Sequence, residues 1–381
     1  MLITSLAGGG AERVASELSL HLGPQIQRQI VTLTNDVSYP SNTPPLSLNF
    51  NFRSPKMLSF LWVLFFGTMK YRRLLNERKP DISMSFLTLD NFINILANLG
   101  KKQSKTILQV HVALSMKFQH SIPDMIARHL ITILYNRADM IIAVSEGVKQ
   151  ELVQGFHINP DIVKVIYNPN DITKIESLAA ESVDNEWFNG MNPIIINIGR
   201  LTEAKGQWHL IRAFAKVRKS VECRLVIAGV GNLKPDLDKL VDELDLNDDI
   251  MFLGWVDNPY KYISKSSLFV SSSLWEALPY SLVEALACGC PIISTDCKYG
   301  PREILGDGHY GLLIPEMDNV VYTASDPLTR EEELLAQKIV EIIENNALRE
   351  RYQSLGRIRA RDFDWRRSIE KYEKVLCEDC A

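Results

Sequence analysis

The stretch from residue 272 to residue 291 reads Ser-Ser-Leu-Trp-Glu-Ala-Leu-Pro-Tyr-Ser-Leu-Val-Glu-Ala-Leu-Ala-Cys-Gly-Cys-Pro. An apolar run, Leu268–Ser271, precedes it and predicts a buried strand. Pro279 then opens a helical pattern, which places Glu276 in the strand-to-helix loop and Glu284 about one turn inside the helix. Amides at a helix start suit a phosphate, and two flanking carboxylates can accept hydrogen bonds from sugar hydroxyls. The plainer alternative is a surface Glu276 and a helical Glu284 paired with a lysine.

A second strand-to-helix loop, Gly199-Arg-Leu-Thr-Glu-Ala-Lys-Gly206, follows the apolar run Pro193–Ile198. It carries Arg200 and Lys205. A guanidinium group binds phosphate as a fork and an ammonium group binds it as a point charge, so this pair suits a diphosphate. Carboxylates close to a diphosphate would repel it unless such cations lie beside them. Ordinary surface charge is the alternative interpretation of this loop.

Both loops belong to a long alternation of short apolar strands and amphipathic helices. The expected strands are Leu2–Leu6, Gln29–Leu33, Asp81–Phe86, Thr106–Val110, Met140–Val144, Val163–Tyr167, Pro193–Ile198, Arg224–Ala228, Ile250–Leu253, Leu268–Ser271 and Pro291–Thr295. Buried strands that alternate with helices predict parallel sheets covered on both faces. The alternation stops in a polar segment and then restarts, so we expect an α/β fold with two doubly wound, Rossmann-like domains facing each other across a cleft.

The expected domain boundaries follow from that interruption. The first domain covers residues 1–170, an irregular linker covers 171–192, the second domain covers 193–360 and a last helical segment covers 361–381. Ligands of such folds bind at the carboxyl ends of the strands. Both candidate loops are therefore expected at the ligand-binding edge of the second domain.

A glycine-rich loop, Gly8-Gly9-Gly10, lies between the first expected strand and a helix over Ala11–Leu22. Glycines let a backbone approach a ligand closely, and amides at the helix start suit a phosphate. The loop lacks the G-x-G-x-x-G spacing of dinucleotide-binding sites. Such sites also carry a ribose-binding acidic residue about 20 positions further along the chain, and only Asp36 lies near that distance. A dinucleotide site is therefore a poor fit and no cofactor is expected. A tight turn without a ligand is the alternative.

Composition restricts the class of protein further. The chain has 381 residues and a net charge of −4, so no nucleic-acid partner is expected. Six cysteines are too few for a disulfide scaffold. The four that we expect to be reduced core residues are Cys223, Cys288, Cys290 and Cys297. Cys377 and Cys380 have a metal-like spacing but lack a second pair, so a frayed tail is expected. No basic segment follows Met1, which argues against an export signal and favours a cytoplasmic location.

The most apolar run, Met57–Phe66, raises the question of a membrane. It is ten residues long, about half of what a spanning helix needs. Two interpretations stay open: a helix packed on the core, or an interfacial helix with apolar residues in the headgroup layer and cations on anionic lipid. Seven basic residues and one acidic residue lie between Arg53 and Lys79. That balance favours a peripheral contact with an anionic membrane.

Taken together and in this order, the loops resemble the retaining glycosyltransferases of family four, which have the GT-B fold. The matching pieces are Gly8–Arg13, Val144–Gly147, Ile166–Pro169, Gly199–Gly206, Gly229–Gly231, Phe252–Gly254 and Glu276–Glu284. The resemblance runs from residue 3 to about residue 375, nearly the whole chain. Two glutamates separated by seven residues are, alone, a moderately specific signal for this family. Together with the Arg/Lys loop at this distance upstream, they are a strong signal.

The resemblance implies a role for each charged loop residue. Glu284 matches the glutamate that holds the ribose hydroxyls of the donor. Glu276 matches the one that contacts hydroxyls of the transferred sugar. Arg200 and Lys205 match the pair that neutralises the nucleotide diphosphate.

The resemblance also assigns backbone amides and a histidine. Amides near Tyr280 and Ser281 would bind the same phosphates, and those of Gly9 and Gly10 would approach the donor phosphate or the acceptor. His111 falls where many family members place a histidine near the transferred sugar, although a valine follows it here instead of the usual acid or asparagine. A buried structural histidine is the alternative. No covalent nucleophile is evident, and a front-face route is favoured for this family.

An Asp-x-Asp sequence, Asp236-Leu-Asp238, imitates the metal site of other transferases. The surrounding pattern is that of an amphipathic helix with Leu237, Leu240 and Val241 inward, so we expect these aspartates on a solvated face. Cationic side chains replace Mg²⁺ in the proposed scheme. No metal is therefore expected, and activity should persist in EDTA.

The closing stretch, Phe363–Leu376, looks like the last helix of the family, which crosses back onto the first domain. Trp365, Ile369, Tyr372 and Leu376 have the spacing to bury one helix face. A plain terminal helix on the second domain fits the same spacing.

The expected function is transfer of a hexose or N-acetylhexosamine from a nucleotide diphosphate sugar to a glycan acceptor with retained configuration. The segment Ser294–Ile304 resembles enzymes of bacterial surface-polysaccharide and lipid-linked oligosaccharide synthesis, many of which use UDP-sugars. This favours UDP and a lipid-linked acceptor at the inner face of the plasma membrane. The alternatives are a nucleotide-sugar epimerase or phosphorylase of similar layout, and a non-catalytic membrane-associated binding protein.

Overall fold

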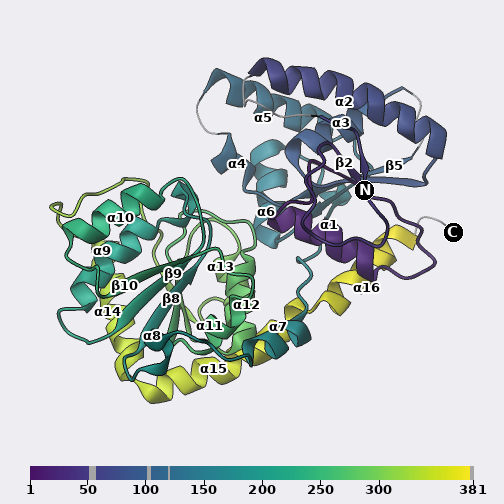
Figure 1. Ribbon diagram of the computed structural model, residues 1–381. Helices are drawn as coiled ribbons and strands as arrows, with labels where there is room; N and C mark the ends of the chain where they lie inside the picture. The colour runs from purple at the N-terminus through teal and green to yellow at the C-terminus, as the bar shows by residue number, and fades with distance from the viewer. Residues whose placement is uncertain (51–56, 101–103, 119–120, 378–381) are drawn as a thin grey trace. The chain divides into compact units, whose positions relative to one another are not determined.

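The computed structural model describes residues 1–50, 57–100, 104–118 and 121–377 (Figure 1). The chain divides into two compact units: unit 1 comprises Met1–Pro169 and the C-terminal segment from Trp365, and unit 2 comprises Asn170–Asp364. Each unit is built on a parallel sheet with the strand order of a doubly wound fold. The prediction of an α/β fold with two Rossmann-like domains is therefore confirmed.

The described residues of unit 1 form a seven-stranded sheet in the order β3-β2-β1-β4-β5-β6-β7. Its strands are β1 (Leu2–Ile3), β2 (Val31–Thr32), β3 (Leu46–Ser47), β4 (Ile82–Ser85), β5 (Lys105–Val110), β6 (Met140–Ala143) and β7 (Val163–Val165). Leu2 pairs in parallel with Val31 on one side and with Ser85 on the other. The strand order therefore reverses between β1 and β4, which is the switch point where such sheets bind ligands.

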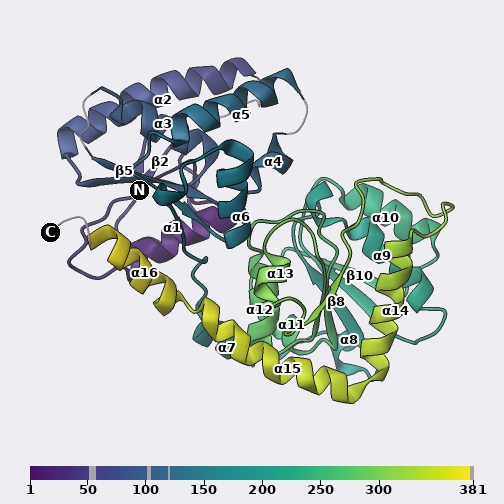
Figure 2. The ribbon, with the colours of Figure 1, turned by 180° about the vertical axis from the view of Figure 1, so that it is seen from behind.

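Helices cover both faces of this sheet. They are α1 (Gly10–His21), α2 (Met57–Arg78), α3 (Thr88–Asn98), α4 (Leu114–Lys117), α5 (Ile122–Tyr135), α6 (Glu146–Gln150) with the π-helical turn η1 (Glu151–Gly155), the 3₁₀ turn η2 (Pro160–Ile162), and α16 (Trp365–Cys377). Helices α2 and α5 both pack on α3, on one side of the sheet, whereas α1 and α16 lie together on the other (Figures 1 and 2).

The last helix, α16, is held to unit 1 by one face. Ile369, Tyr372 and Leu376 are buried, at the spacing the sequence indicated. Trp365 lies against the ring of His21 with centroids 4.1 Å apart. Since the buried residues recur every three or four positions, a single helix face makes these contacts.

The described residues of unit 2 form a six-stranded parallel sheet in the order β10-β9-β8-β11-β12-β13. Its strands are β8 (Ile194–Ile198), β9 (Arg224–Ala228), β10 (Ile250–Gly254), β11 (Leu268–Ser271), β12 (Ile292–Thr295) and β13 (Leu312–Ile314). The helices are α7 (Ile172–Ala179), α8 (Glu186–Asn189), η3 (Glu203–Lys205), α9 (Gln207–Val217), α10 (Lys234–Glu243), α11 (Tyr260–Ser264), α12 (Tyr280–Cys288), α13 (Pro301–Ile304), α14 (Arg330–Glu344), α15 (Asn346–Ala360) and η4 (Arg361–Phe363). The order reverses between β8 and β11.

The segment 171–192 differs from the irregular linker that we expected. Helix α7 lies within it, and Ile172, Ile175 and Ala179 bury one face against α11 and α12. Asp171 caps this helix by accepting a hydrogen bond from the amide of Lys174 at 3.0 Å. The polar composition of the segment concealed the helix because only one narrow face is apolar.

Helix α2 packs on the core with one face and exposes large apolar side chains on the other. Val63, Tyr71 and Leu75 are buried against the core of unit 1, as the packed-helix interpretation requires. The opposite side leaves large apolar residues exposed: Phe60, Leu61, Trp62, Phe65, Phe66 and Met69. Across the described ranges, no helix is both long and apolar enough to cross a membrane. Arg53 and Lys56, two of the seven basic residues counted between Arg53 and Lys79, lie outside the described residues.

The four cysteines expected in the core, Cys223, Cys288, Cys290 and Cys297, are buried and free. Burial is the main cause that raises the pKa of each of these thiols. They are therefore unreactive packing residues, as predicted. Cys377 is a free, exposed cysteine at the end of α16, and Cys380 lies outside the described residues.

Candidate active site

The candidate loops of unit 2 lie at its topological switch point. Strands β8 and β11 are neighbours, paired through Ile195–Leu268 and Ile196–Phe269. The loop after β8 carries Arg200 and Lys205, and the loop after β11 carries Glu276. Because parallel strands end at the same edge of the sheet, these two loops meet where ligands of doubly wound folds bind.

Two hydrogen bonds to backbone carbonyls of the first loop join the two loops. The hydroxyl of Ser272 donates to the carbonyl of Lys205 at 3.0 Å, and the amide of Leu274 donates to the carbonyl of Ala204 at 2.9 Å. Gly206 makes this approach possible: its φ is +55°, and a Cβ there would lie 2.5 Å from the carbonyl oxygen of Ser272. A larger residue at 206 would force the loops apart.

Lys205 and Glu276 form an ion pair between Nζ and Oε1. Their side chains are only 18% and 12% exposed, respectively. The same carboxylate oxygen accepts a hydrogen bond from the hydroxyl of Ser273 at 2.7 Å. The methylenes of Lys205 pass over Gly199, with Cε 3.3 Å from the place a Cβ would take. The sequence thus brings a cation and a carboxylate that are 71 positions apart into contact.

Arg200 lies on the same loop as Lys205 and is exposed. It forms no ion pair with any residue that the structure describes. Its own carbonyl accepts a hydrogen bond from the side-chain amide of Gln207 at 3.1 Å, which fixes the backbone beneath it. An exposed guanidinium group on the loop that also carries Lys205 is available to an anionic ligand.

Helix α12 begins at Tyr280, and both Tyr280 and Ser281 are half-buried in its first turn. The residue before the helix is Pro279, whose side chain has no hydrogen-bond acceptor with which to cap the first amides. The positive end of the helix dipole therefore points to the loop that carries Glu276. These two features suit a phosphate.

Glu284 lies one turn further along α12 and is only 7% exposed. Its Oε1 accepts a hydrogen bond from the hydroxyl of Tyr260, on α11, at 3.1 Å. A buried carboxylate needs such a partner to offset its lost hydration. The phenol of Tyr260 therefore fixes the position of Glu284.

In unit 1, the glycine-rich loop follows β1, one of the two strands at the switch point. Gly9 precedes α1 and Gly10 is its first residue. The carboxylate of Glu12 folds back over Gly9, with Oε2 2.0 Å from the place a Cβ would take. A phosphate approaching these amides would have to displace Glu12, because both are anions.

His111 directly follows β5 and is half-buried. Its Nε2 lies 3.0 Å from Oε1 of Gln109, and its ring stacks on Phe86 with centroids 6.0 Å apart. Burial lowers the pKa of the imidazole to about 3, and a hydrogen bond with Asn168 acts in the opposite direction. His111 is therefore neutral at physiological pH.

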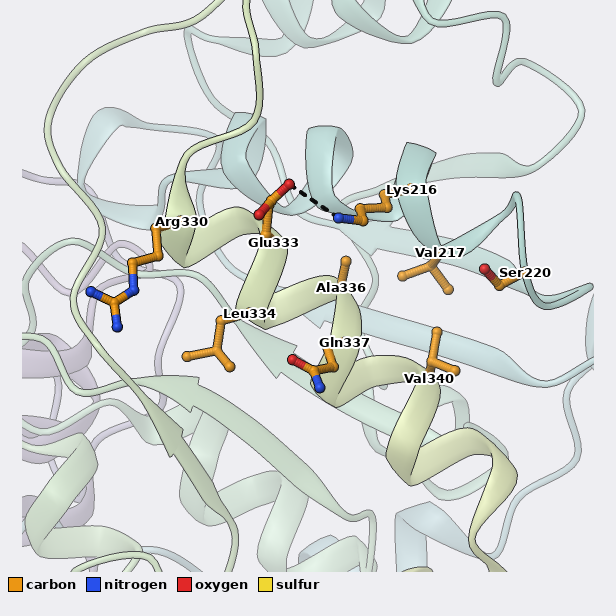
Figure 3. A pocket seen from close by; sticks show the side chains of 9 residues that line it. All are labelled: Lys216, Val217, Ser220, Arg330, Glu333, Leu334, Ala336, Gln337 and Val340. Carbon is orange, nitrogen blue, oxygen red and sulfur yellow. Dashed lines mark hydrogen bonds and ion pairs between the residues drawn. The ribbon is translucent and has the colours of Figure 1, made fainter.

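Two other features lie away from these loops. Asp236 is exposed on α10 and Asp238 pairs with Lys234 of the same helix at 2.5 Å, so the Asp-x-Asp sequence forms part of a solvated face, as predicted. A surface hollow of about 550 Å³ lies between α9 and α14 (Figure 3). It contains an exposed ion pair, Lys216–Glu333, and is lined by none of the predicted site residues.

Sequence reasoning did not find the residues that hold the two glutamates. Ser273 was part of the quoted stretch but carried no signal beyond its place in a polar loop. Tyr260 lies 24 positions before Glu284 on a different helix. No local spacing relates two such residues, and only the packing of α11 against α12 brings them together.

Comparisons with known proteins bear on these loops. The family model described as Glycosyltransferase Family 4 matches residues 8–174, and the one described as Glycosyl transferases group 1 matches residues 180–359. A Campylobacter jejuni protein, N-acetylgalactosamine-N,N'-diacetylbacillosaminyl-diphospho-undecaprenol 4-alpha-N-acetylgalactosaminyltransferase, is 32% identical over 96% of this chain and 95% of its own length.

Two solved structures share the fold. HepE of Anabaena in complex with UDP and glucose has a TM-score of 0.76, at 19% identity and 99% coverage of both chains. Sucrose-phosphate synthase of Thermosynechococcus elongatus has a TM-score of 0.79, at 17% identity, covering 99% of this chain and 98% of its own. From the family models and the similarity along its full length to a curated transferase, the chain belongs to glycosyltransferase family 4 and is a glycosyltransferase with the GT-B fold.

Proposed function

We propose that this glycosyltransferase transfers a hexose or an N-acetylhexosamine from a UDP-sugar to a lipid-linked glycan acceptor, with retention of the α configuration. The acceptor class follows the Campylobacter relative, whose name specifies a diphospho-undecaprenol-linked acceptor. UDP follows the structural neighbour HepE, which is described with UDP and glucose.

The observation that carries this proposal is the Lys205–Glu276 pair at the switch point of unit 2. In the proposed complex the ammonium group of Lys205 contacts the diphosphate, together with Arg200 and the first amides of α12. Glu276 accepts hydrogen bonds from hydroxyls of the transferred sugar, and Glu284 accepts them from the ribose. A cation and a carboxylate in contact match a ligand that carries an anionic group beside neutral hydroxyls.

The chemical step that we propose needs no covalent intermediate. The bond between the anomeric carbon and the phosphate oxygen breaks, and the acceptor oxygen bonds to the same carbon on the same face. The proton of the acceptor hydroxyl moves to the departing phosphate oxygen. Arg200, Lys205 and the helix amides stabilise the charge that develops on the diphosphate, which is the largest demand of the reaction. Trapping of a glycosyl-enzyme adduct would contradict this route.

Replacing Glu276 by alanine tests the site. We expect kcat with the best donor of a UDP- and GDP-sugar panel to fall by about 100-fold or more, since the sugar hydroxyls lose a preorganised acceptor. The donor is first identified by thermal stabilisation, because a ligand at 100 times its Kd stabilises a protein by roughly 2.7 kcal/mol. Steady-state kinetics then measures the loss.

Glu333→Ala provides the matched control for Glu276→Ala. Glu333 also pairs with a lysine, Lys216, but on the exposed surface between α9 and α14 (Figure 3). The activity of the Glu333→Ala variant should stay within about twofold of the wild type, because exposed ion pairs contribute little to stability and this pair lies away from the site. Undiminished turnover by folded Glu276→Ala protein would show that the assigned site is wrong.

We also propose that the transfer does not depend on a metal ion. Arg200 and Lys205 supply two positive charges at the site, which is the electrostatic role that Mg²⁺ plays on diphosphates elsewhere. Turnover measured after treatment with EDTA is expected to match the untreated rate. A loss of activity that added Mg²⁺ or Mn²⁺ restores would contradict this part of the proposal.

The exposed apolar residues of α2 and α5 provide the membrane contact that we propose. We call them the α2–α5 surface: Phe60, Leu61, Trp62, Phe65, Phe66, Met69, Met125, Ile126, Leu130 and Ile133. Phe65 and Met125 are 61% and 64% exposed, which is unusual for large apolar side chains. Exposed cations on the same helix, Lys70 and Arg73, suit anionic headgroups.

The bilayer is the partner that this surface fits best, because an undecaprenol-type acceptor lies in a membrane. We therefore place the protein at the cytoplasmic face of the plasma membrane as a peripheral protein.

A further inference from the structure

A buried glutamine links the last helix of the chain to His111. Gln109 is the last residue but one of β5 and is fully buried. Its Oε1 accepts a hydrogen bond from the hydroxyl of Tyr372, on α16, at 3.0 Å. The same oxygen lies 3.0 Å from Nε2 of His111. All three side chains belong to unit 1, although Gln109 and Tyr372 are 263 positions apart.

The neighbours of Gln109 select one orientation of its amide. The amide nitrogen lies 3.0 Å from Sδ of Met84, and a thioether can accept a hydrogen bond but cannot donate one. Turning the amide over would place its oxygen against the sulfur, where no hydrogen bond can form. Oε1 therefore faces His111. Because an amide oxygen only accepts, the proton between them belongs to Nε2 of His111.

The hydroxyl of Tyr372 completes this arrangement. Burial raises the pKa of Tyr372, whereas its hydrogen bond to Gln109 lowers it, and the phenol stays protonated and able to donate. With donors from both Tyr372 and His111, Oε1 of Gln109 uses both of its lone pairs. Phe86, stacked at an interplanar angle of 19°, holds the plane of the imidazole.

We propose that Gln109 and Tyr372 are positioning residues for the transfer reaction, and that together they hold His111 as the Nε2-protonated tautomer. The lone pair of the ring then lies on Nδ1. In this arrangement α16 contributes to the site in unit 1 through the hydroxyl of Tyr372. The link to the reaction rests on the proposed function together with the family resemblance, which implies that His111 lies near the transferred sugar. The tautomer itself does not rest on that function.

The tautomer is measured directly by ¹⁵N NMR of protein labelled at histidine, without any donor or acceptor. The ring signals of His111 are assigned by their loss in His111→Gln. We expect the Nε2-protonated pattern in the wild type. In Gln109→Leu, which removes the acceptor, we expect a shift towards the Nδ1-protonated pattern. In Tyr372→Phe, which removes one hydroxyl group, we expect a smaller shift in the same direction.

The kinetic arm uses the donor identified by the panel. Removal of a group that orients a histidine costs roughly 10- to 100-fold in comparable metal sites, so we expect kcat to fall by about 10-fold or more in Tyr372→Phe. KM for the donor should change by less than about twofold, because neither residue binds it. Tyr71→Phe is the matched control: its hydroxyl is also buried and bonds to Ser83 at 2.7 Å, but it has no contact with His111.

Three results are decisive. A tautomer shift in both variants together with a lower kcat, and neither effect in Tyr71→Phe, supports the proposal. An unchanged Nε2-protonated pattern in both Gln109→Leu and Tyr372→Phe overturns it, as does a shifted tautomer with wild-type kcat. Should Gln109→Leu fail to fold, Tyr372→Phe decides alone. If the wild type turns over none of the donors, the proposed function fails, whereas the NMR arm still decides whether these residues hold His111.

Discussion

Replacing Lys205 by methionine is expected to lower kcat with the best nucleotide-sugar donor by about 100- to 1000-fold, the loss typical of one electrostatic group aimed at developing charge. Methionine keeps an apolar stem over Gly199 but removes the cation. The diphosphate leaving group then loses a counter-charge, and Glu276 loses its ion-pair partner in a site where its side chain is 12% exposed. Steady-state kinetics measures the loss, on variant protein whose melting temperature matches that of the wild type.

Lys216→Met is the control for Lys205→Met. Lys216 lies near the other end of α9 and pairs with Glu333 at 3.1 Å, with side chains 48% and 56% exposed. Its kcat should equal that of the wild type within about twofold. The double variant Lys205→Met/Glu276→Ala should be no worse than the poorer single variant, because residues in contact act as a unit. Wild-type kcat/KM in folded Lys205→Met protein would remove the basis of the proposed function.

The second large effect concerns membrane binding. We expect the double variant Trp62→Ser/Phe65→Ser to bind anionic vesicles about 100-fold more weakly than the wild type. Burial of one such side chain contributes roughly 1.5–3 kcal/mol, and each 1.4 kcal/mol is about tenfold in affinity. Trp62 and Phe65 are 53% and 61% exposed and lie one turn apart on α2. Because the ring of Trp62 also contacts the buried ring of Phe50, with centroids 5.5 Å apart, the melting temperature of the variant is compared with that of the wild type first. Co-sedimentation with vesicles of phosphatidylglycerol and phosphatidylcholine measures the affinity.

Met191→Ser/Ile358→Ser provides a comparison that also removes two exposed apolar side chains. Met191 and Ile358 are 101% and 67% exposed and lie in unit 2, outside the α2–α5 surface. This variant should bind vesicles like the wild type. Wild-type vesicle binding by the Trp62→Ser/Phe65→Ser variant would show that the α2–α5 surface is not a membrane contact. Turnover of a water-soluble acceptor analogue should be unaffected in both variants.

Much of the fold could be predicted because most strands lie in short runs of buried apolar residues that alternate with amphipathic helices. Ile194–Ile198 and Arg224–Ala228 lie within a residue of their expected bounds. The misses were β3 and β13, which have two and three residues and lie at the edges of their sheets. An edge strand of that length buries too little to leave a periodic signal. Helix α7 was missed because its apolar face is narrow.

The candidate site could be predicted only as a set of loops. The order of motifs indicated that Arg200, Lys205, Glu276 and Glu284 belong to one edge of a doubly wound sheet. It did not indicate that Lys205 and Glu276 pair, because that contact depends on how closely Gly206 lets one loop approach the other. Nor did it indicate that Tyr260 holds Glu284.

What the sequence determined by itself was the class of fold, the place of each loop on it and the family, because strand–helix alternation and short motifs are local properties of a chain. What only the tertiary structure decided was which side chains meet. Tyr372, Gln109 and His111 are held together because β5 and α16 pack in the same unit, although Gln109 and Tyr372 are 263 positions apart in the sequence. Hydrogen bonds form between neighbours in space, and packing of whole elements makes distant residues neighbours.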